Sequence, residues 1–185
     1  MRYNRLLDRI RRSLEDLQKG IQGLVVMSVD LEQTFNCIYV GQVPPSWRGT
    51  FPSMKPLASW LRDLIERVDF FAQWSLTGRP PLIFWMSAFT FPTGFLTAVL
   101  QMSARANSVS IDTLAWEFPV MTLDDVNILE QPKDGVYVRG LYLEGAGWDK
   151  KSASLIEAAS MELNCVIPTI HFKPIDSKKV EKKKG

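Results

Sequence analysis

The sequence contains very little histidine and cysteine. It has one histidine, His171, and two cysteines, Cys37 and Cys165, in 185 residues. Zinc sites and acid–base centres usually draw on several such residues, so zinc-finger and HExxH patterns are excluded. The cysteines form no CxxC pair. The sequence also lacks the signal-peptide pattern of a basic start followed by an apolar core and a cleavage site. We expect an intracellular protein with free thiols and no metal site.

The sequence also lacks a phosphate-binding loop. The Walker pattern needs a glycine followed directly by lysine, and no glycine here has that neighbour. Gly145 and Gly147 form only a GxG, and Trp148 after them favours a packed turn over a phosphate cradle. The serines have no GxSxG context. We therefore expect neither a catalytic residue nor a cofactor in this protein; an enzyme with an unrecognised site that uses His171 is an alternative.

Basic residues are concentrated at one end. Residues 173–185 carry six lysines against Asp176 and Glu181, a charge of +4. Since the whole chain has a net charge of +2, the remainder carries −2. It therefore lacks the excess of basic residues that is typical of nucleic-acid-binding proteins. Residues 175–185 are expected to form a basic linker or disordered tail. The alternative is that this tail binds an acidic partner.

One long segment contains no charged residue. It runs from Pro80 to Ala104, long enough to span a bilayer. Prolines, a glycine and scattered polar residues interrupt it, which is atypical of a membrane helix. A strand or turn followed by a buried helix explains it better, so no membrane partner is expected.

Apolar residues spaced by three or four predict four helices in the first part of the chain. The expected helices are the start up to Gly20, Leu24 to Gly41, Pro56 to Gly78, and Pro92 to Asn107. Between the second and third, Gly41 to Pro52 contains three prolines and is expected to be an ordered loop.

Later in the sequence the apolar period changes to two, which is typical of half-buried strands. Strands are expected at Leu114 to Val120, Val136 to Leu143, and Val166 to Phe172. Residues 152–163 are ambiguous, because their composition favours helix although they lie among strands. The order of elements predicts an α+β fold, with a helical subdomain at 1–108 and an antiparallel β subdomain at 109–174.

Several polar and aromatic residues could serve either structure or function. His171 fits a half-exposed strand position better than a catalytic base. Asp124 and Asp125 fit a solvated turn better than a calcium loop. The six tryptophans fit a core, although some could face a partner.

Five phrases, in order, resemble the C-terminal region that follows the AAA+ ring in dynein heavy chains. They are YNRLLDRIRRSLEDLQKGIQGLVVMSVDLE from Tyr3, VPPSWRGTFPSMKPLASWLRDLIERVDFFAQW from Val43, PPLIFWMSAFTFPTGFLTAVLQMSARANSVSIDTLAWEF from Pro80, DGVYVRGLYLEGAGWD from Asp134, and PTIHFKP from Pro168.

The resemblance implies a bundle of helices followed by an incomplete antiparallel β-barrel that lies across the motor ring. It implies a non-catalytic cap that braces ring modules of the same heavy chain and tunes motor output. ATP and magnesium would belong to those modules, and the dynein complex and microtubules would be partners through the parent chain. The resemblance also makes Ser154–Ile156 and Met161–Leu163 extended rather than helical.

The phrases FWMSAFTFP and GLYLEGAGWD look more like axonemal than cytoplasmic heavy chains. This implies the cytoskeleton of a cilium or flagellum, within the cytoplasm. Dynein chains usually continue beyond the lysine-rich linker into final strands, whereas this sequence stops at Gly185. We expect exposed sheet edges and apolar surface, and poor solubility or self-association, as a result. The alternative function is an autonomous adaptor or scaffold domain that uses its basic tail.

Overall fold

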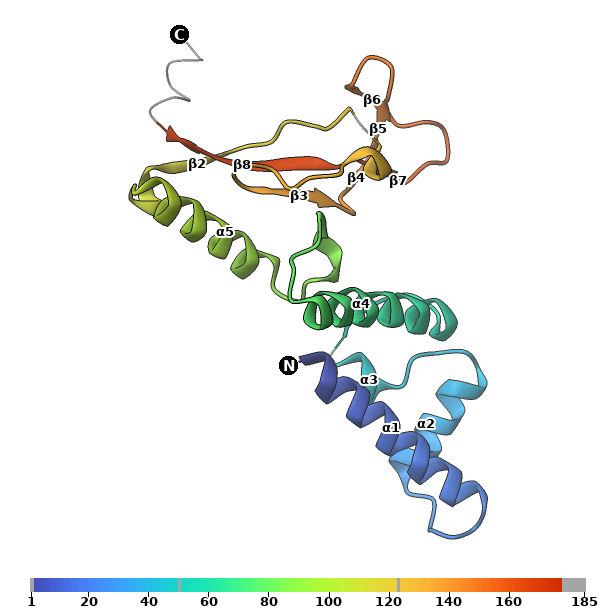
Figure 1. Cartoon of the computed structure of the whole chain (residues 1–185). Helices are drawn as coiled ribbons and strands as arrows, with labels where there is room; N and C mark the ends of the chain where they lie inside the picture. The colour runs from blue at the N-terminus through green and yellow to red at the C-terminus, as the bar shows by residue number, and fades with distance from the viewer. Residues whose placement is uncertain (1, 50, 123, 178–185) are drawn as a thin grey trace. The chain divides into compact units, whose positions relative to one another are not determined.

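The computed structural model describes residues 2–49, 51–122 and 124–177. The chain forms two compact units, Met1–Gly78 and Arg79–Gly185. Among the described residues, the first unit contains only helices, and the second contains one long helix and all the strands (Figure 1). The expected α+β class is confirmed. The subdomain limits at 108/109 and 174/175 stay a prediction.

Four helices form the described part of the first unit. They are α1 (Arg2–Ile21), α2 (Val29–Tyr39), α3 (Pro45–Arg48) and α4 (Leu57–Thr77). α1 is amphipathic, with Leu6 and Leu17 buried along one side. α4 ends at Gly78, which has a φ of 63° and donates its N–H to the Trp74 carbonyl. Only glycine adopts this left-handed backbone without a steric cost, so it fixes the end of α4.

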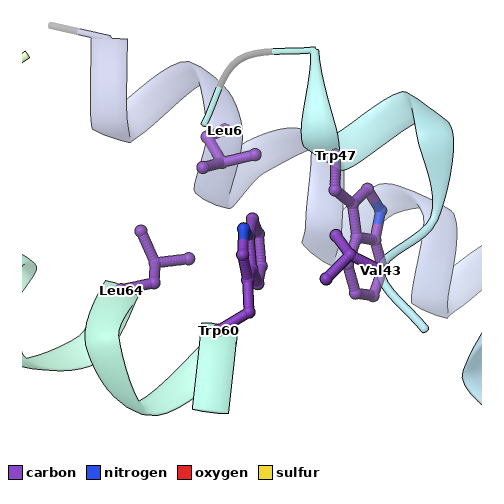
Figure 2. Packing of buried hydrophobic residues seen from close by; sticks show 5 residues of the cluster. All are labelled: Leu6, Val43, Trp47, Trp60 and Leu64. Carbon is purple, nitrogen blue, oxygen red and sulfur yellow. The ribbon is translucent and has the colours of Figure 1, made fainter. Parts of the chain in front are cut away.

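The core of the first unit is built around Trp60. Figure 2 shows its indole between Leu64 on one side and Trp47 and Val43 on the other, with Leu6 of α1 beside it. The Trp60 and Trp47 ring centroids are 6.2 Å apart. The Trp60 Nε1–H donates to the Phe51 carbonyl at 3.0 Å, and the Trp47 Nε1–H donates to the Ser13 hydroxyl at 3.0 Å. Both indoles therefore bury their apolar area without leaving a donor unpaired.

The second unit contains one long helix, eight short strands and three 3₁₀ turns among its described residues. In sequence order they are β1 (Ile83–Trp85), η1 (Met86–Ala88), α5 (Pro92–Asn107), η2 (Ile111–Thr113), β2 (Leu114–Glu117), η3 (Asp125–Asn127), β3 (Val136–Arg139), β4 (Tyr142–Glu144), β5 (Ala146–Asp149), β6 (Ser154–Glu157), β7 (Asn164–Val166) and β8 (Ile170–Asp176).

The strands form three open sheets. The largest has the order β1-β3-β8-β2, and β4-β7 and β5-β6 form two pairs. All pairings are antiparallel except β1 with β3, which is parallel. Figure 1 shows the β5–β6 hairpin and β7 at one end of the long sheet. Because no sheet closes among the described residues, the arrangement is consistent with the expected incomplete barrel.

The core of the second unit lies between α5 and the largest sheet. Met86, Val138 and Phe172 are buried there, and Phe95 and Leu96 of α5 pack against them. Phe95 also stacks on Phe89 with ring centroids 4.4 Å apart. The uncharged run from Pro80 therefore forms a strand and a helix that is partly buried against the sheet, as expected. Within the described ranges, no helix has both the length and the apolar character that a membrane span requires.

The helical expectations were partly wrong in the region before α4. α2 begins at Val29 rather than at Leu24, because the Ser28 hydroxyl accepts the Leu31 N–H and caps the helix there. The expected loop from Gly41 to Pro52 contains the short helix α3. Proline at the first helical position has a suitable φ and no N–H to leave unpaired, so Pro45 can begin a helix.

Three strand expectations also needed correction. The single strand expected from Val136 to Leu143 is two strands, β3 and β4, because Gly140 turns the backbone with a φ of 78°. The strand expected from Val166 to Phe172 is divided between β7 and β8. Residues 154–157 are extended as β6, but 161–163 form no strand, and Met161 has a φ of 69°.

Candidate functional site: an apolar surface on residues 21–40

His171 forms part of a structural junction. It lies in β8, where its Nε2–H donates to the main-chain carbonyl of Asp134 at 2.8 Å. Its ring is half-buried beside Tyr137, with centroids 5.0 Å apart. In this position the histidine ties β8 to the turn that precedes β3.

Asp134 makes the other contacts of this junction, and it was not among the candidate site residues of the sequence. Its Oδ2 accepts hydrogen bonds from the Ser103 hydroxyl at 2.8 Å and the Asn107 amide at 3.3 Å, both from α5. Its Oδ1 accepts the Gly135 N–H at 2.8 Å. Ser103 is buried, so this carboxylate fastens α5 to the β3 turn. The Asp-Gly pair was the available signal, since it is typical of a tight turn.

Of the remaining candidate residues, Asp125 and Gly147 have structural partners. Asp124 and Asp125 lie in the exposed turn at η3, and Asp125 accepts a hydrogen bond from the buried Thr169 hydroxyl. Gly147 lies inside β5, where a Cβ atom would come within 3.1 Å of Ile156 Cγ1. Among the described residues, no three histidine, cysteine or acidic side chains are grouped so that they could hold a metal ion.

In the part of the chain that the structure describes, Tyr3 and Asp149 have shifted pKa values. Burial raises the pKa of Tyr3, and the nearby positive charge of Arg67 opposes that shift. Hydrogen bonds from Ser152 and the Lys151 N–H lower the pKa of the Asp149 carboxyl. Tyr3 lies in the helical core and Asp149 in a hairpin turn. Neither site offers a pair of groups suited to proton transfer chemistry.

The most unusual feature of the first unit is an exposed apolar segment. Residues 21–40 contain only two charged side chains, Asp30 and Glu32. Six large apolar side chains in this segment are between 62% and 92% exposed. We call them the 21–40 surface: Ile21, Leu24, Val26, Val29, Tyr39 and Val40. Single exposed apolar residues are common, but six within one segment of the chain point to a contact surface.

Local sequence explains why this segment stays outside the core. α1 ends after Ile21, where Gly23 takes a φ of 73° and the Leu24 N–H donates to the Lys19 carbonyl at 2.9 Å. The backbone then runs without regular structure to the Ser28 cap. In α2, Thr34 is buried and its hydroxyl donates to the Asp30 carbonyl. The opposite side of α2 therefore faces outward with Val29 and Tyr39.

A charged groove of about 600 Å³ adjoins this segment. α1 lines it with Arg5, Arg9 and Arg12, and α2 lines it with Ser28 and Asp30 among others. Arg12 pairs with Asp8 at 2.8 Å, and Arg9 donates to the Ser46 carbonyl. Charges of both signs alternate here, which suits polar contacts around the rim of an interface better than binding of one anion.

Residues 24–41 were expected to form one helix, and this exposed surface was not predicted. The low charge of residues 21–40 was the signal that could have revealed it, since an exposed helix normally carries a charged face. Chemically, the surface can bind another apolar surface; it presents no group for covalent or acid–base chemistry.

Comparison with known proteins supports one family. The family profile that describes the C-terminal domain of dynein heavy chains matches residues 1–185. The chain is 62% identical over 178 residues to human dynein axonemal heavy chain 2, and 51% identical over 178 residues to the Chlamydomonas reinhardtii dynein-1-beta heavy chain of the flagellar inner arm I1 complex. It is 43% identical over 182 residues to mouse dynein axonemal heavy chain 1.

These matches cover 96% to 98% of this chain but 4% of each relative. The 185 residues therefore correspond to a small part of a very large polypeptide. Their full-length match to the profile confirms the resemblance found in the sequence. The chain belongs to the family of C-terminal domains of dynein heavy chains.

Proposed function

We propose that this chain is a non-catalytic structural and regulatory domain that caps and braces the AAA+ ring of a dynein heavy chain. Its relatives are named as axonemal or flagellar heavy chains, so the motility it serves is that of a cilium or flagellum. The proposed location is the axonemal cytoskeleton within the cytoplasm. ATP and magnesium bind in ring modules of the parent chain, which also links this domain to microtubules and the dynein complex.

The 21–40 surface is the observation that carries the proposal. A domain that folds and works alone has no reason to expose six large apolar side chains in a segment with two charges. A domain fixed permanently to its own chain gains stability by covering such a surface, because burial of each large apolar residue contributes about 1.5–3 kcal/mol. The proposed cover is a ring module of the same heavy chain.

A charge placed in this surface tests the proposal. We expect Val26→Asp in the parent heavy chain to lower microtubule-gliding velocity or ATP turnover several-fold, because burying an unpaired carboxylate costs several kcal/mol. The matched control is Val126→Asp, since Val126 is 82% exposed in the second unit. Equal effects of the two substitutions, or no effect of Val26→Asp on either assay, would contradict the proposal.

The adaptor alternative depends on the lysine-rich tail, whose residues 178–184 lie outside the described part of the chain. None of the comparisons supports that reading. The enzyme alternative depends on His171, and the junction with Asp134 gives that residue a structural partner.

A further inference from the structure

Strand β6 has an open edge. It pairs along one side with β5, in a register that sets Leu155 opposite Trp148 and Ile156 opposite Gly147. β5 packs beside β7, so the other edge of β6 has no neighbouring strand among the described residues (Figure 1). An open edge presents unpaired N–H and C=O groups, which can pair with another strand.

The β6 edge lacks several of the usual protections against pairing, although the strand is short and ends at Glu157. Residues 154–157 contain no proline and no lysine. Leu155 is 61% exposed and Ile156 is 51% exposed, although both are large and apolar. Natural proteins often protect such edges with lysine, proline or a bulge, and β6, in regular register with β5, has none of these three, so its edge is available to another strand.

Charges of opposite sign lie at the two ends of β6. Lys150 and Lys151 occupy the turn before the strand, and the Asp149 carboxylate holds that turn through the Lys151 N–H and the Ser152 hydroxyl. Glu157 ends the strand, and Glu162 follows in the next turn. No lysine or arginine occurs between residues 152 and 172. β6 thus has a basic end and an acidic end.

This polarity makes β6 complementary to itself in the antiparallel direction. If two copies pair about a two-fold axis, Leu155 of one lies opposite Ile156 of the other, and Ser154 lies opposite Glu157. The lysine turn of each copy then faces the acidic end of its partner. Parallel pairing would instead bring like charges together, which is unfavourable.

We propose that β6 is a homotypic docking strand, through which two copies of this chain pair antiparallel and join their β5–β6 hairpins into one four-stranded sheet. This interface is separate from the 21–40 surface and does not depend on the proposed ring contact. Four residues bury less area than a stable dimer needs, so the association is weak and depends on concentration. Salt weakens it, because exposed charge pairs contribute to it.

Charge-swap variants of the full 185-residue chain test the proposal by sedimentation equilibrium. Variant one is Lys150→Glu with Lys151→Glu, and variant two is Glu157→Lys with Glu162→Lys. Each alone places like charges at both ends of the paired strands, so we expect its dimer dissociation constant to rise about tenfold or more. An equimolar mixture restores opposite charges at both ends, and we expect it to form a heterodimer about as tight as the dimer of the unchanged protein.

The four positions are exposed, so circular dichroism and thermal melting should show that both variants fold like the unchanged protein. Self-association that is the same in the unchanged protein and in both variants would mean that another surface, such as the 21–40 surface, drives it, and would overturn the proposal. A mixture that associates no better than the separate variants would also overturn it, as would an unchanged protein that stays monomeric at all concentrations.

Discussion

At the scale of single residues, aromatic side chains and a few hydrogen-bonded polar groups stabilise the folded structure of each unit. Trp60 is fully buried in a cluster with residues of α1, α3 and α4, and its only side-chain donor, the indole N–H, donates to the Phe51 carbonyl. Pairing matters because a buried donor left without a partner costs about 1–3 kcal/mol. One residue thus supplies both apolar burial and a hydrogen bond to the loop before its helix.

We expect Trp60→Ala to lower the free energy of unfolding of the first unit by about 3–5 kcal/mol, because it removes a buried ring and leaves a cavity. Leu76→Ala serves as the control, since Leu76 lies on the same helix α4 but is 87% exposed. That control should change stability by less than about 0.5 kcal/mol. Urea unfolding followed by tryptophan fluorescence and circular dichroism measures both. Equal effects would mean that Trp60 is not the centre of this core.

At the scale of elements, residues that begin or end helices made some predictions accurate. α4 and α5 appear where they were expected, because Gly78 ends one and Pro92 begins the other. The uncharged run was also assigned correctly to a strand followed by a helix. These signals act within a few residues of the position that they determine, so the sequence alone reveals them.

Other elements depend on contacts that the sequence does not show. The period of Leu24, Leu31 and Ile38 is helical, but only Leu31 and Ile38 fall in a helix, and Leu24 is exposed. Periodicity identifies an apolar stripe without showing whether a partner covers it. The division of β3 from β4 depends on Gly140. The carbonyl of this residue accepts a hydrogen bond from the Ser87 hydroxyl at 2.6 Å. A contact between residues 53 positions apart cannot be read from local pattern.

In the second unit, the junction at Asp134 joins α5 to the turn before β3, and its contribution to stability can be tested. We expect Asp134→Ala to destabilise this unit by about 1–3 kcal/mol, because the buried Ser103 hydroxyl loses its acceptor. Asp112→Ala is the control, since Asp112 is exposed in η2. Thermal unfolding followed by circular dichroism compares the two. If Asp112→Ala proved as costly as Asp134→Ala, the junction would have no special part in joining α5 to the sheet.

At the scale of the whole molecule, the exposed apolar residues suggest a domain adapted to remain in contact with other parts of a large protein. The 21–40 surface and the β6 edge lie in different units and differ in character. The first is apolar and almost uncharged, which suits a permanent contact. The second is short and flanked by opposite charges, which suits a weak and reversible one. The sequence reveals the family, whereas these surfaces become visible only in the folded protein.

Hydrogen exchange of residues 24–29 tests the ring contact most directly, in the isolated domain and in the parent heavy chain with its ring. In the described part of this protein, the amides of Val26 and Met27 make no backbone hydrogen bond, so they should exchange rapidly in isolation. If a ring module covers the 21–40 surface, their exchange should be more than about tenfold slower in the heavy chain, while amides around Trp60 stay protected in both. Equally rapid exchange of residues 24–29 in the two proteins would contradict the proposed cap.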